Sequence, residues 1–309
     1  MVLFLTTPVG VGHVNGFVKR FDRAWGRDLV EMTYAELFRR GSAPTGCAYL
    51  FTDRERMSEP SRAIACELWE RLEGCGQPVR LLNDPRKQLN RHDLLLKLYH
   101  SGVNDFRPFR LAELADAKPR FPVFLRIEDD HSGPKSELIT DASQLELEFR
   151  KLLLGGIPEE KIIAIEFSEV AEADGMRRKF GAVRIGDEVI CQHILFSRDW
   201  NVKAEGSIRE PANLEESDEY FRTNPHAERL MPIFETAGIE FGRIDYSLCG
   251  NSIRVWEIND NPRIATGRYR RLSNVRKGPR FYEAFMKLTE GLEQGRPISI
   301  ADEILVAAG

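Results

Sequence analysis

The segment from 242 to 263 constrains the fold more than any other part of this sequence. Two short runs rich in apolar residues, 243–248 and 252–258, flank Cys249-Gly250-Asn251. Runs of this length on either side of a glycine-containing turn predict two antiparallel strands joined as a β-hairpin. We expect the loop to have three residues, an odd number, because this decides which side chains share a face.

The side chains of this hairpin divide between two faces of the predicted sheet. A three-residue loop pairs Asp245 with Val255, so that Asp245 lies diagonal to Glu257 on one face. Because side chains alternate along a strand, Asn259 lies on that face too. A two-residue turn would instead put Asp245 on the opposite face. That opposite face would carry an apolar, core-facing stripe formed by Ile244, Tyr246, Leu248, Trp256 and Ile258.

Asp245, Glu257 and Asn259 form a candidate metal site. Two carboxylates and an amide oxygen are the hard donors that Mg²⁺ prefers when it also holds substrate phosphates, and Mn²⁺ accepts the same donors. A surface hairpin with scattered acids, or one that holds only a structural ion, is the alternative interpretation.

The composition is that of an ordinary globular protein. A length of 309 residues exceeds one simple core and suggests two or three domains. The hydrophobic content of 42% and the charged content of 30% are typical of such proteins. A net charge of −4 gives no bulk electrostatic case for nucleic acid or an anionic membrane as a partner.

The sequence also bears on the compartment. The five cysteines are scattered and form no C-x-x-C pair, which favours reduced thiols. The residues at 1–8 lack a basic region followed by a long apolar run, so we expect no signal peptide. No stretch approaches 18 apolar residues, so we expect no membrane span. We therefore expect a cytoplasmic protein.

The first 88 residues predict a small parallel α/β domain. Strands are expected at 2–5, 47–51 and 79–82, and a helix between Ser58 and Gly74. Strands that alternate with helices are typical of a parallel sheet.

The rest of the chain continues to alternate helices and strands. Asn90 and Asp141 are predicted N-caps of two helices that stop at Gly102 and at Gly155. Gly186-Asp187 predicts the turn of a second hairpin. Further elements are expected at 122–127 and 161–167 (strands), 180–185 and 189–196 (hairpin strands), up to Gly238 (one long helix), and at 279–290 and 300–308 (helices).

This order of parts resembles the ATP-grasp superfamily. Its members have a small N-terminal α/β domain, a strand–loop–strand lid, and a C-terminal sheet that ends in D…E-x-N. The resemblance is strongest at 243–263, and it extends to the lid strand 122–126 and the hinge strand 165–167. It implies an ATP-grasp fold, α/β with an α+β C-terminal part and a small Rossmann-like N-terminal domain. The implied domains are 1–88 (N-terminal), 89–168 (linker helix and lid) and 169–309 (C-terminal, with the metal site).

Within the superfamily, a little-characterised bacterial branch offers a narrower resemblance. It rests on Arg178-Lys179-Phe180, His193 and Trp200-Asn-Val-Lys203, which follow in the same order as in that branch.

The resemblance assigns roles residue by residue. It implies Asp245, Glu257 and Asn259 as Mg²⁺ ligands, and Arg126 in place of the lid lysine over the phosphates of ATP. An arginine gives a planar two-pronged grip where a lysine gives a point charge. The other residues implied for ATP are Lys135, Glu166, Phe167, Glu169, Lys179 and His193. Those implied for the acyl-phosphate, the substrate carboxylate or the γ-phosphate are Arg198, Lys203 and Arg263.

Several of these residues also have a structural interpretation. His193 lies in an apolar strand, where a single histidine is more often structural. Arg198 and Lys203 would be unremarkable as surface charges. The glycine-rich turn at 10–16 lacks the G-x-G-x-x-G spacing, which favours a tight turn over a dinucleotide site.

The resemblance implies a ligase that activates a carboxylate as an acyl-phosphate for attack by an amine. Small-molecule or peptide acids and amines are the expected partners, and a homodimer is left open. The absence of nucleophile motifs such as G-x-S-x-G or H-E-x-x-H favours chemistry driven by ATP over hydrolysis.

Two features of the lid leave other functions open. The loop after Arg126 has one glycine, and its three acids, 128–130, would repel a triphosphate unless they point away. A nucleotide-binding protein without ligase activity and an ATP-grasp kinase are therefore the alternatives.

Overall fold

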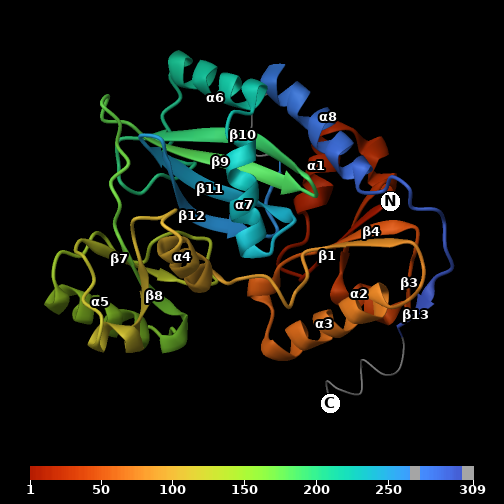
Figure 1. Ribbon diagram of the computed structural model, residues 1–309, viewed down its shortest axis with the longest axis horizontal. Helices are drawn as coiled ribbons and strands as arrows, with labels where there is room; N and C mark the ends of the chain where they lie inside the picture. Colours follow the sequence, from red (N-terminus) through yellow and green to blue (C-terminus); the bar gives the residue numbers. More distant parts are fainter. Residues whose placement is uncertain (265–271, 301–309) are drawn as a thin grey trace.

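The computed structural model describes residues 1–264 and 272–300. Within these residues the strands form two four-stranded sheets, one three-stranded sheet and one two-stranded pair. Figure 1 shows the three larger sheets in separate regions of the molecule, with helices packed on each. No helix in this part of the chain is both long enough and apolar enough to cross a membrane.

The N-terminal sheet is parallel, with the strand order β2-β1-β4-β5. Its strands are β1 (Val2–Thr6), β2 (Leu29–Thr33), β4 (Cys47–Phe51) and β5 (Val79–Leu82), and its helices are α1 (His13–Phe21), α2 (Tyr34–Arg39) and α3 (Glu59–Glu73). Every residue of β1 and β4 is buried, as expected of central strands covered on both faces. The parallel sheet with alternating helices predicted for 1–88 is confirmed.

Side-chain caps fix the starts of three helices where the sequence predicts them. Ser58 accepts a hydrogen bond at the start of α3, Asn90 at the start of α4 (Arg91–His100), and Asp141 at the start of α5 (Ala142–Leu154). Each cap satisfies a backbone N–H that has no partner within the helix. Short 3-10 turns lie at Arg23–Arg27, Arg54–Arg56, Leu111–Ala115 and Glu159–Lys161.

The lid sheet is antiparallel, with the order β6-β8-β7. Its strands are β6 (Pro108–Arg110), β7 (Val123–Ile127) and β8 (Ile162–Glu166). One face packs against α5 through Leu145 and Phe149. The other face presents Phe124, Ile163 and Ile165 to an aromatic cluster that includes Trp256 of the C-terminal sheet.

The C-terminal sheet is antiparallel and carries two helices on one face. Its order is β10-β9-β11-β12, formed by Glu188–Ser197, Arg177–Ile185, Phe241–Cys249 and Ser252–Asn259. The predicted single long helix before it is wrong, because the segment forms α6 (Pro211–Thr223) and α7 (Ala227–Ala237). Asn224 adopts a left-handed conformation with a φ of 51° and Pro225 follows, so the first helix cannot continue.

The predicted three-residue loop of the C-terminal hairpin is also wrong. Cys249 pairs with Ser252, which leaves a two-residue turn. A β-bulge in β12 corrects the register, because Tyr246 pairs with Val255 while Asp245 pairs with Glu257. Asp245 and Glu257 are therefore directly opposite rather than diagonal.

The bulge also changes the apolar stripe predicted for the other face of this hairpin. Trp256 is the extra residue of the bulge, and its ring stacks on Phe106 with centroids 5.2 Å apart. Its indole Nε1 donates to the hydroxyl of Ser247 at 2.9 Å. Val255 takes the place predicted for Trp256 in the core beneath the sheet.

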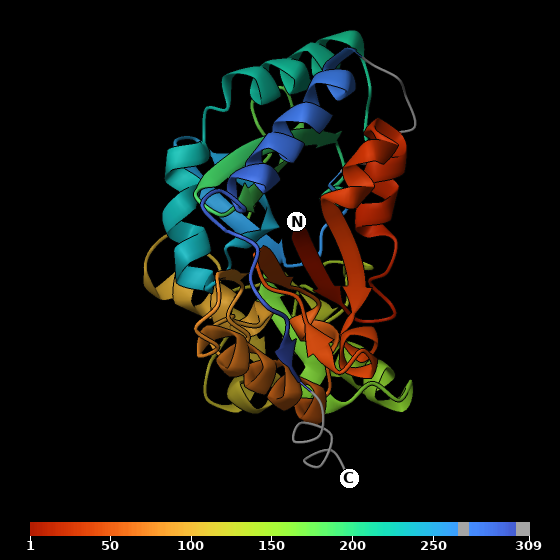
Figure 2. The same ribbon diagram turned by 90° about the vertical axis from the view of Figure 1, so that its right-hand side faces the viewer.

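The last described segment returns to the N-terminal domain. Helix α8 (Leu272–Lys287) begins earlier than predicted, and β13 (Ile298–Ser299) pairs with β3 (Ser42–Ala43). Figure 2 shows α8 between the C-terminal sheet and α1. The helix predicted at 300–308 lies almost wholly outside the described residues.

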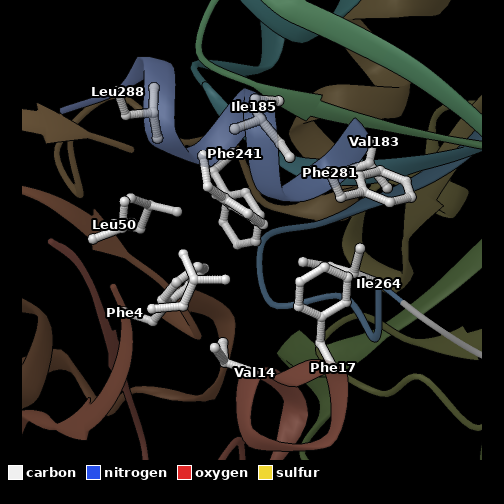
Figure 3. Packing of buried hydrophobic residues seen from close by; sticks show 14 of the residues in the cluster. Phe4, Val14, Phe17, Leu50, Val183, Ile185, Phe241, Ile264, Phe281 and Leu288 are labelled. Carbon is white, nitrogen blue, oxygen red and sulfur yellow. The ribbon is translucent and has the colours of Figure 1, made fainter. Parts of the chain in front are cut away.

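One apolar core joins the N-terminal and C-terminal sheets. Phe4 of β1 lies edge-to-face against Phe241 of β11, with ring centroids 5.5 Å apart, and against Phe285 of α8. Figure 3 shows Phe4, Phe17, Phe241 and Phe281 converging in this core. The two regions are thus held against each other by burial of apolar surface.

Candidate active site

The centre of the candidate site is a pair of carboxylates on one face of the C-terminal sheet. Asp245 of β11 and Glu257 of β12 are cross-strand partners, and both side chains are largely buried. Asn259 lies on the same face, where it pairs with Arg243. Its Oδ1 accepts the backbone N–H of Asn261 at 2.8 Å. The structure therefore brings together all three predicted metal ligands.

Two cations flank Asp245. Arg243 Nε donates to Asp245 Oδ1 at 2.8 Å, and Lys179 Nζ lies 3.7 Å from Asp245 Oδ2. Burial would raise the pKa of Asp245, but the charges of Arg243 and Lys179 outweigh it and lower the pKa. Lys179, predicted to contact phosphate, lies beside the carboxylate pair.

Two further arginines hold Glu257. Arg126 of the lid strand donates to Glu257 Oε2 at 3.1 Å, and Arg91 of α4 donates to the same oxygen at 2.6 Å. Burial would raise the pKa of Glu257, but the guanidinium groups of Arg126 and Arg91 hold it well below its usual range. Arg126 thus reaches from the lid sheet to the predicted metal ligands.

Sequence reasoning missed Arg91. Its Nη1 donates to the backbone carbonyls of Ile127, Glu128 and Asp130 in the lid loop, so one guanidinium joins that loop to Glu257. The sequence shows only that Arg91 directly follows the Asn90 cap at the start of α4, which does not predict where its side chain reaches.

His193 reaches the same face of the sheet through a second β-bulge. Cys191 pairs with Ala182 and His193 pairs with Gly181, so Gln192 is the extra residue. Gly181 is in turn the partner of Asp245. Burial, together with the charge of Arg243, lowers the pKa of His193 to about 3, so its imidazole is neutral.

These donors suit a divalent cation that also binds phosphate. Within the described residues no three His, Cys, Asp or Glu side chains gather as a complete ligand set. The hairpin instead offers two facing carboxylates and one amide, a set that leaves room for phosphate oxygens and water around Mg²⁺. The charge of Glu257 acts to raise the pKa of Asp245, and a cation between the two carboxylates would relieve that repulsion.

The three acids of the lid loop all have partners of their own. Glu128 accepts from Arg110, Asp129 pairs with Lys161, and Asp130 accepts from Ser132 and pairs with Lys135. Lys135, predicted to contact phosphate, is therefore engaged within its own loop. It lines a hollow of about 530 Å³ together with Lys203, whose side chain passes over Gly133 of that loop.

The three predicted hinge residues have partners away from the carboxylate pair. Glu166 lies on the face of β8 that packs against α5, and its carboxylate accepts the backbone N–H groups of Arg107 and Arg120. Phe167 lies edge-to-face against Trp200, with ring centroids 6.2 Å apart. Glu169 is exposed and pairs with Arg177.

Two predicted catalytic residues lie apart from the carboxylate pair. Arg198 is exposed and donates to the carbonyl of Asp174 at 3.3 Å. Arg263 is exposed as well, and its Nε donates to His13 Nε2 at 3.4 Å. Arg263 therefore lies at the contact with the N-terminal domain.

The segment after Asn259 is tied to that domain by further polar contacts that the sequence did not predict. Asn261 donates to Thr6 and Asp53, each at 3.0 Å, and Asp260 accepts the backbone N–H of Arg54. Burial and the nearby carboxylates raise the pKa of Asp260 to about 7. No short sequence pattern links these residues, because the partners lie 206 to 255 positions apart.

The N-terminus of α1 is closed to phosphate. The carboxylate of Glu31 accepts the backbone N–H groups of Gly12, His13 and Val14. It therefore fills the position that an anion would take at a helix N-terminus. This arrangement agrees with the tight turn that we expect at 10–16.

No protein-family model and no curated protein sequence matches this chain. Solved structures do match over nearly the whole length. D-alanine–D-alanine ligase from Bacillus anthracis matches with a TM-score of 0.53 and 13% identity, over 94% of this chain and 97% of that one.

Two other solved structures match to a similar degree. D-cycloserine synthetase DcsG has a TM-score of 0.52 and 15% identity, over 92% of this chain and 99% of its own. The ATP-grasp ligase PsnB, complexed with a minimal precursor, has a TM-score of 0.51 and 13% identity, over 94% and 99%. The small N-terminal sheet, the lid sheet and the C-terminal sheet of this chain together form the ATP-grasp fold.

Proposed function

We propose that this protein is an ATP- and Mg²⁺-dependent ligase that activates a carboxylate as an acyl-phosphate for attack by an amine. The observation that carries the proposal is the pairing of Asp245 with Glu257 across β11 and β12, under a lid strand that contributes Arg126. The names of the similar structures, two ligases and a synthetase, add support from the fold.

The charge distribution suits phosphoryl transfer. That reaction depends on positioning and on neutralising charge on the phosphate oxygens, which metal ions and Arg or Lys side chains provide. Mg²⁺ would be held by Asp245, Glu257 and Asn259, and it would supply charge neutralisation at the phosphates. Arg126 and Lys179 lie beside those ligands, where they would contact the transferred group.

The lid also supports this function better than its sequence suggests. The acids 128–130 each have a partner, so they would not face the triphosphate as free charges. The neutral imidazole of His193 adds no repulsion and offers a ring nitrogen on the same face.

In the proposed reaction, a carboxylate oxygen of the acid substrate attacks the γ-phosphorus of ATP and ADP leaves. The amine then attacks the acyl carbon, loses a proton, and displaces inorganic phosphate to give an amide. Holding both substrates on one face converts these steps into reactions between neighbours. Small-molecule or peptide acids and amines are the proposed substrates.

The substrate end of the site would lie at the N-terminal domain. His13 contacts both Asn261 and Arg263, so the loop before α1 meets the segment that follows the metal ligands. An arginine at this contact suits a substrate carboxylate, because its guanidinium can grip both oxygens.

A nucleotide-binding protein without turnover is the second candidate. The observation that favours it is the short contact between Glu257 and both Arg91 and Arg126. These arginines neutralise the carboxylate that the metal would need, so they would compete with Mg²⁺ for it.

The test is release of ADP from Mg²⁺-ATP across panels of carboxylic acids and amines, with product mass measured. A ligase gives an amide, ADP and phosphate, and Glu257→Gln abolishes the reaction. ATP binding without ADP release in any combination would support the second candidate. A phosphorylated product that never becomes an amide would indicate a kinase.

A further inference from the structure

The imidazole of His193 rests directly on a glycine of the neighbouring strand. A methyl group at Gly181 would lie 2.5 Å from Cε1, 2.8 Å from Nε2 and 3.0 Å from Nδ1 of His193. All three of its nearest neighbours belong to this one ring. Since carbon atoms do not approach a ring this closely, any side chain at Gly181 would move the imidazole.

The bulge at Gln192 aims His193 at this position. In a regular strand Cys191 and His193 would point to the same face, and Cys191 belongs to the apolar core beneath the sheet. The extra residue turns His193 to the face of Asp245 instead. Bulges are frequent next to active sites, where they re-aim a side chain.

Contacts from other elements fix the bulge. The side-chain amide of Gln192 donates to the carbonyl of Ile264, and Lys277 of α8 donates to the carbonyl of Gln192 at 2.9 Å. The bulge is thus anchored both to the segment after the metal ligands and to the last helix.

The ring lies among the charges of the candidate site. Gly181 of β9 pairs with His193 of β10 on one side and with Asp245 of β11 on the other. Lys179 precedes Gly181 by two residues and lies on the same face. Nδ1 of His193 is buried and has no hydrogen-bond partner among the described residues. Buried polar atoms are almost always hydrogen-bonded, so an unpaired nitrogen beside these charges is a candidate hydrogen-bond partner for a ligand.

We propose that Gly181 is a positioning residue. Because Gly181 has no side chain, the imidazole of His193 lies flat beside Asp245 and hydrogen-bonds the phosphates of the bound nucleotide. The inference rests on the proposed function, because it takes ATP as the ligand at Asp245 and Glu257. It extends that function to a residue with no functional group of its own.

The experiment is a double-mutant cycle on Mg²⁺-ATP affinity with Gly181→Ala, His193→Ala and both together. Hydrogen bonds to charged groups predict a loss of about tenfold for each single variant. The double variant should also lose about tenfold, because the displaced ring and the missing ring have the same effect. A loss near a hundredfold in the double variant would overturn the proposal, as would unchanged affinity in Gly181→Ala.

Thermal unfolding of the same variants gives a second readout. The three atoms nearest to the methyl group of Gly181→Ala all belong to the imidazole. The double variant should therefore unfold at a higher temperature than Gly181→Ala alone. If Gly181→Ala fails to fold, a folded double variant still supports the contact between the imidazole and Gly181. A double variant less stable than either single variant would contradict it. Gly16→Ala is the matched control, because a Cβ there has no heavy atom within 4 Å.

A parallel measurement on Glu257→Gln separates this inference from the proposed function. If Glu257→Gln weakens Mg²⁺-ATP binding but Gly181→Ala does not, only the role of Gly181 is wrong. If neither variant changes the affinity, the nucleotide does not bind at this face and the proposed function fails with it.

Discussion

At the scale of single residues, the site depends on buried charges that compensate one another. Glu257 is almost enclosed and accepts from two guanidinium groups, one on α4 and one on the lid strand β7. Removing one of the two leaves the buried carboxylate with less compensation, and such a loss costs more than a buried pair itself contributes. Of the two arginines, Arg91 should contribute more to stability, because it also donates to three carbonyls of the lid loop.

Arg91→Met should therefore destabilise the protein strongly. We expect the free energy of unfolding to fall by about 3 kcal/mol, measured by chemical denaturation. Arg150→Met is the control, because Arg150 forms an exposed pair with Glu146 and such pairs contribute about 0–1 kcal/mol. Equal losses in the two variants would contradict a structural role for the buried arginine.

At the scale of elements, an ion pair ties the lid loop to the N-terminal domain. His131 Nε2 lies 2.7 Å from Glu55 Oε1 in the 3-10 turn Arg54–Arg56. Burial lowers the pKa of His131, but the hydrogen bond and the charge of Glu55 outweigh it, so the pKa is raised. A histidine with a raised pKa stabilises the fold below its unfolded pKa, and this stabilisation disappears as the pH rises through the folded pKa.

The stability difference between the wild type and His131→Gln should therefore depend on pH. The wild type should be more stable by up to about 1 kcal/mol near pH 6, the size expected of a partly exposed pair. At a pH above both the unfolded and the folded pKa, the imidazole is neutral in both states, and the difference should vanish. A constant difference across this range, followed by thermal denaturation, would show that the pair does not titrate.

The sequence predicts some features of these elements correctly and misses others. The caps Ser58, Asn90 and Asp141 act within one helical turn, so local pattern predicts the starts of α3, α4 and α5 correctly. The bulges at Gln192 and Trp256 follow no local rule, because they result from packing on the neighbouring strands. An expectation of regular alternation therefore gave the wrong loop length.

The facing of Asp245 and Glu257 was predicted on the basis of that wrong loop. A two-residue turn plus the extra residue of one bulge inserts three residues, the same number as a three-residue loop. The shorter turn and the bulge therefore cancel each other for the carboxylates, which lie on the same face as predicted. They do not cancel for Trp256, which lies on the lid side of the hairpin. Long-range partners such as Arg91 for Glu257 were not predicted, because only the folded chain brings residues so distant in sequence together.

At the scale of the whole molecule, one apolar core makes the N-terminal and C-terminal sheets interdependent. Phe285 of α8 is fully buried and lies within ring contact of Phe4 and Phe241, with centroids 5.2 and 5.8 Å apart. The pairing of β13 with β3 adds a second connection from the end of the described chain to the N-terminal domain. Each of the three larger sheets lies within one of the segments 1–88, 89–168 and 169–309, and this core joins the first segment to the third.

Phe285→Ala should destabilise both regions together. We expect a loss of about 3–5 kcal/mol, typical of a large aromatic removed from a packed core. Thermal unfolding should show a single transition at a lower temperature, in far-UV circular dichroism and in tryptophan fluorescence alike. Leu147→Ala, on the exposed face of α5, is the control with little expected change. Two separated transitions would mean that the sheets unfold independently.

The most direct test of the central claim is the affinity of the wild type, Asp245→Asn and Glu257→Gln for ATP, measured by calorimetry with and without Mg²⁺. If these carboxylates hold the metal that binds the phosphates, Mg²⁺ strengthens ATP binding to the wild type, and each variant loses most of that gain. We expect the loss to be at least about tenfold, equal to about 1.4 kcal/mol. Wild-type binding that does not respond to Mg²⁺, or variants that keep the full Mg²⁺ effect, would contradict the account.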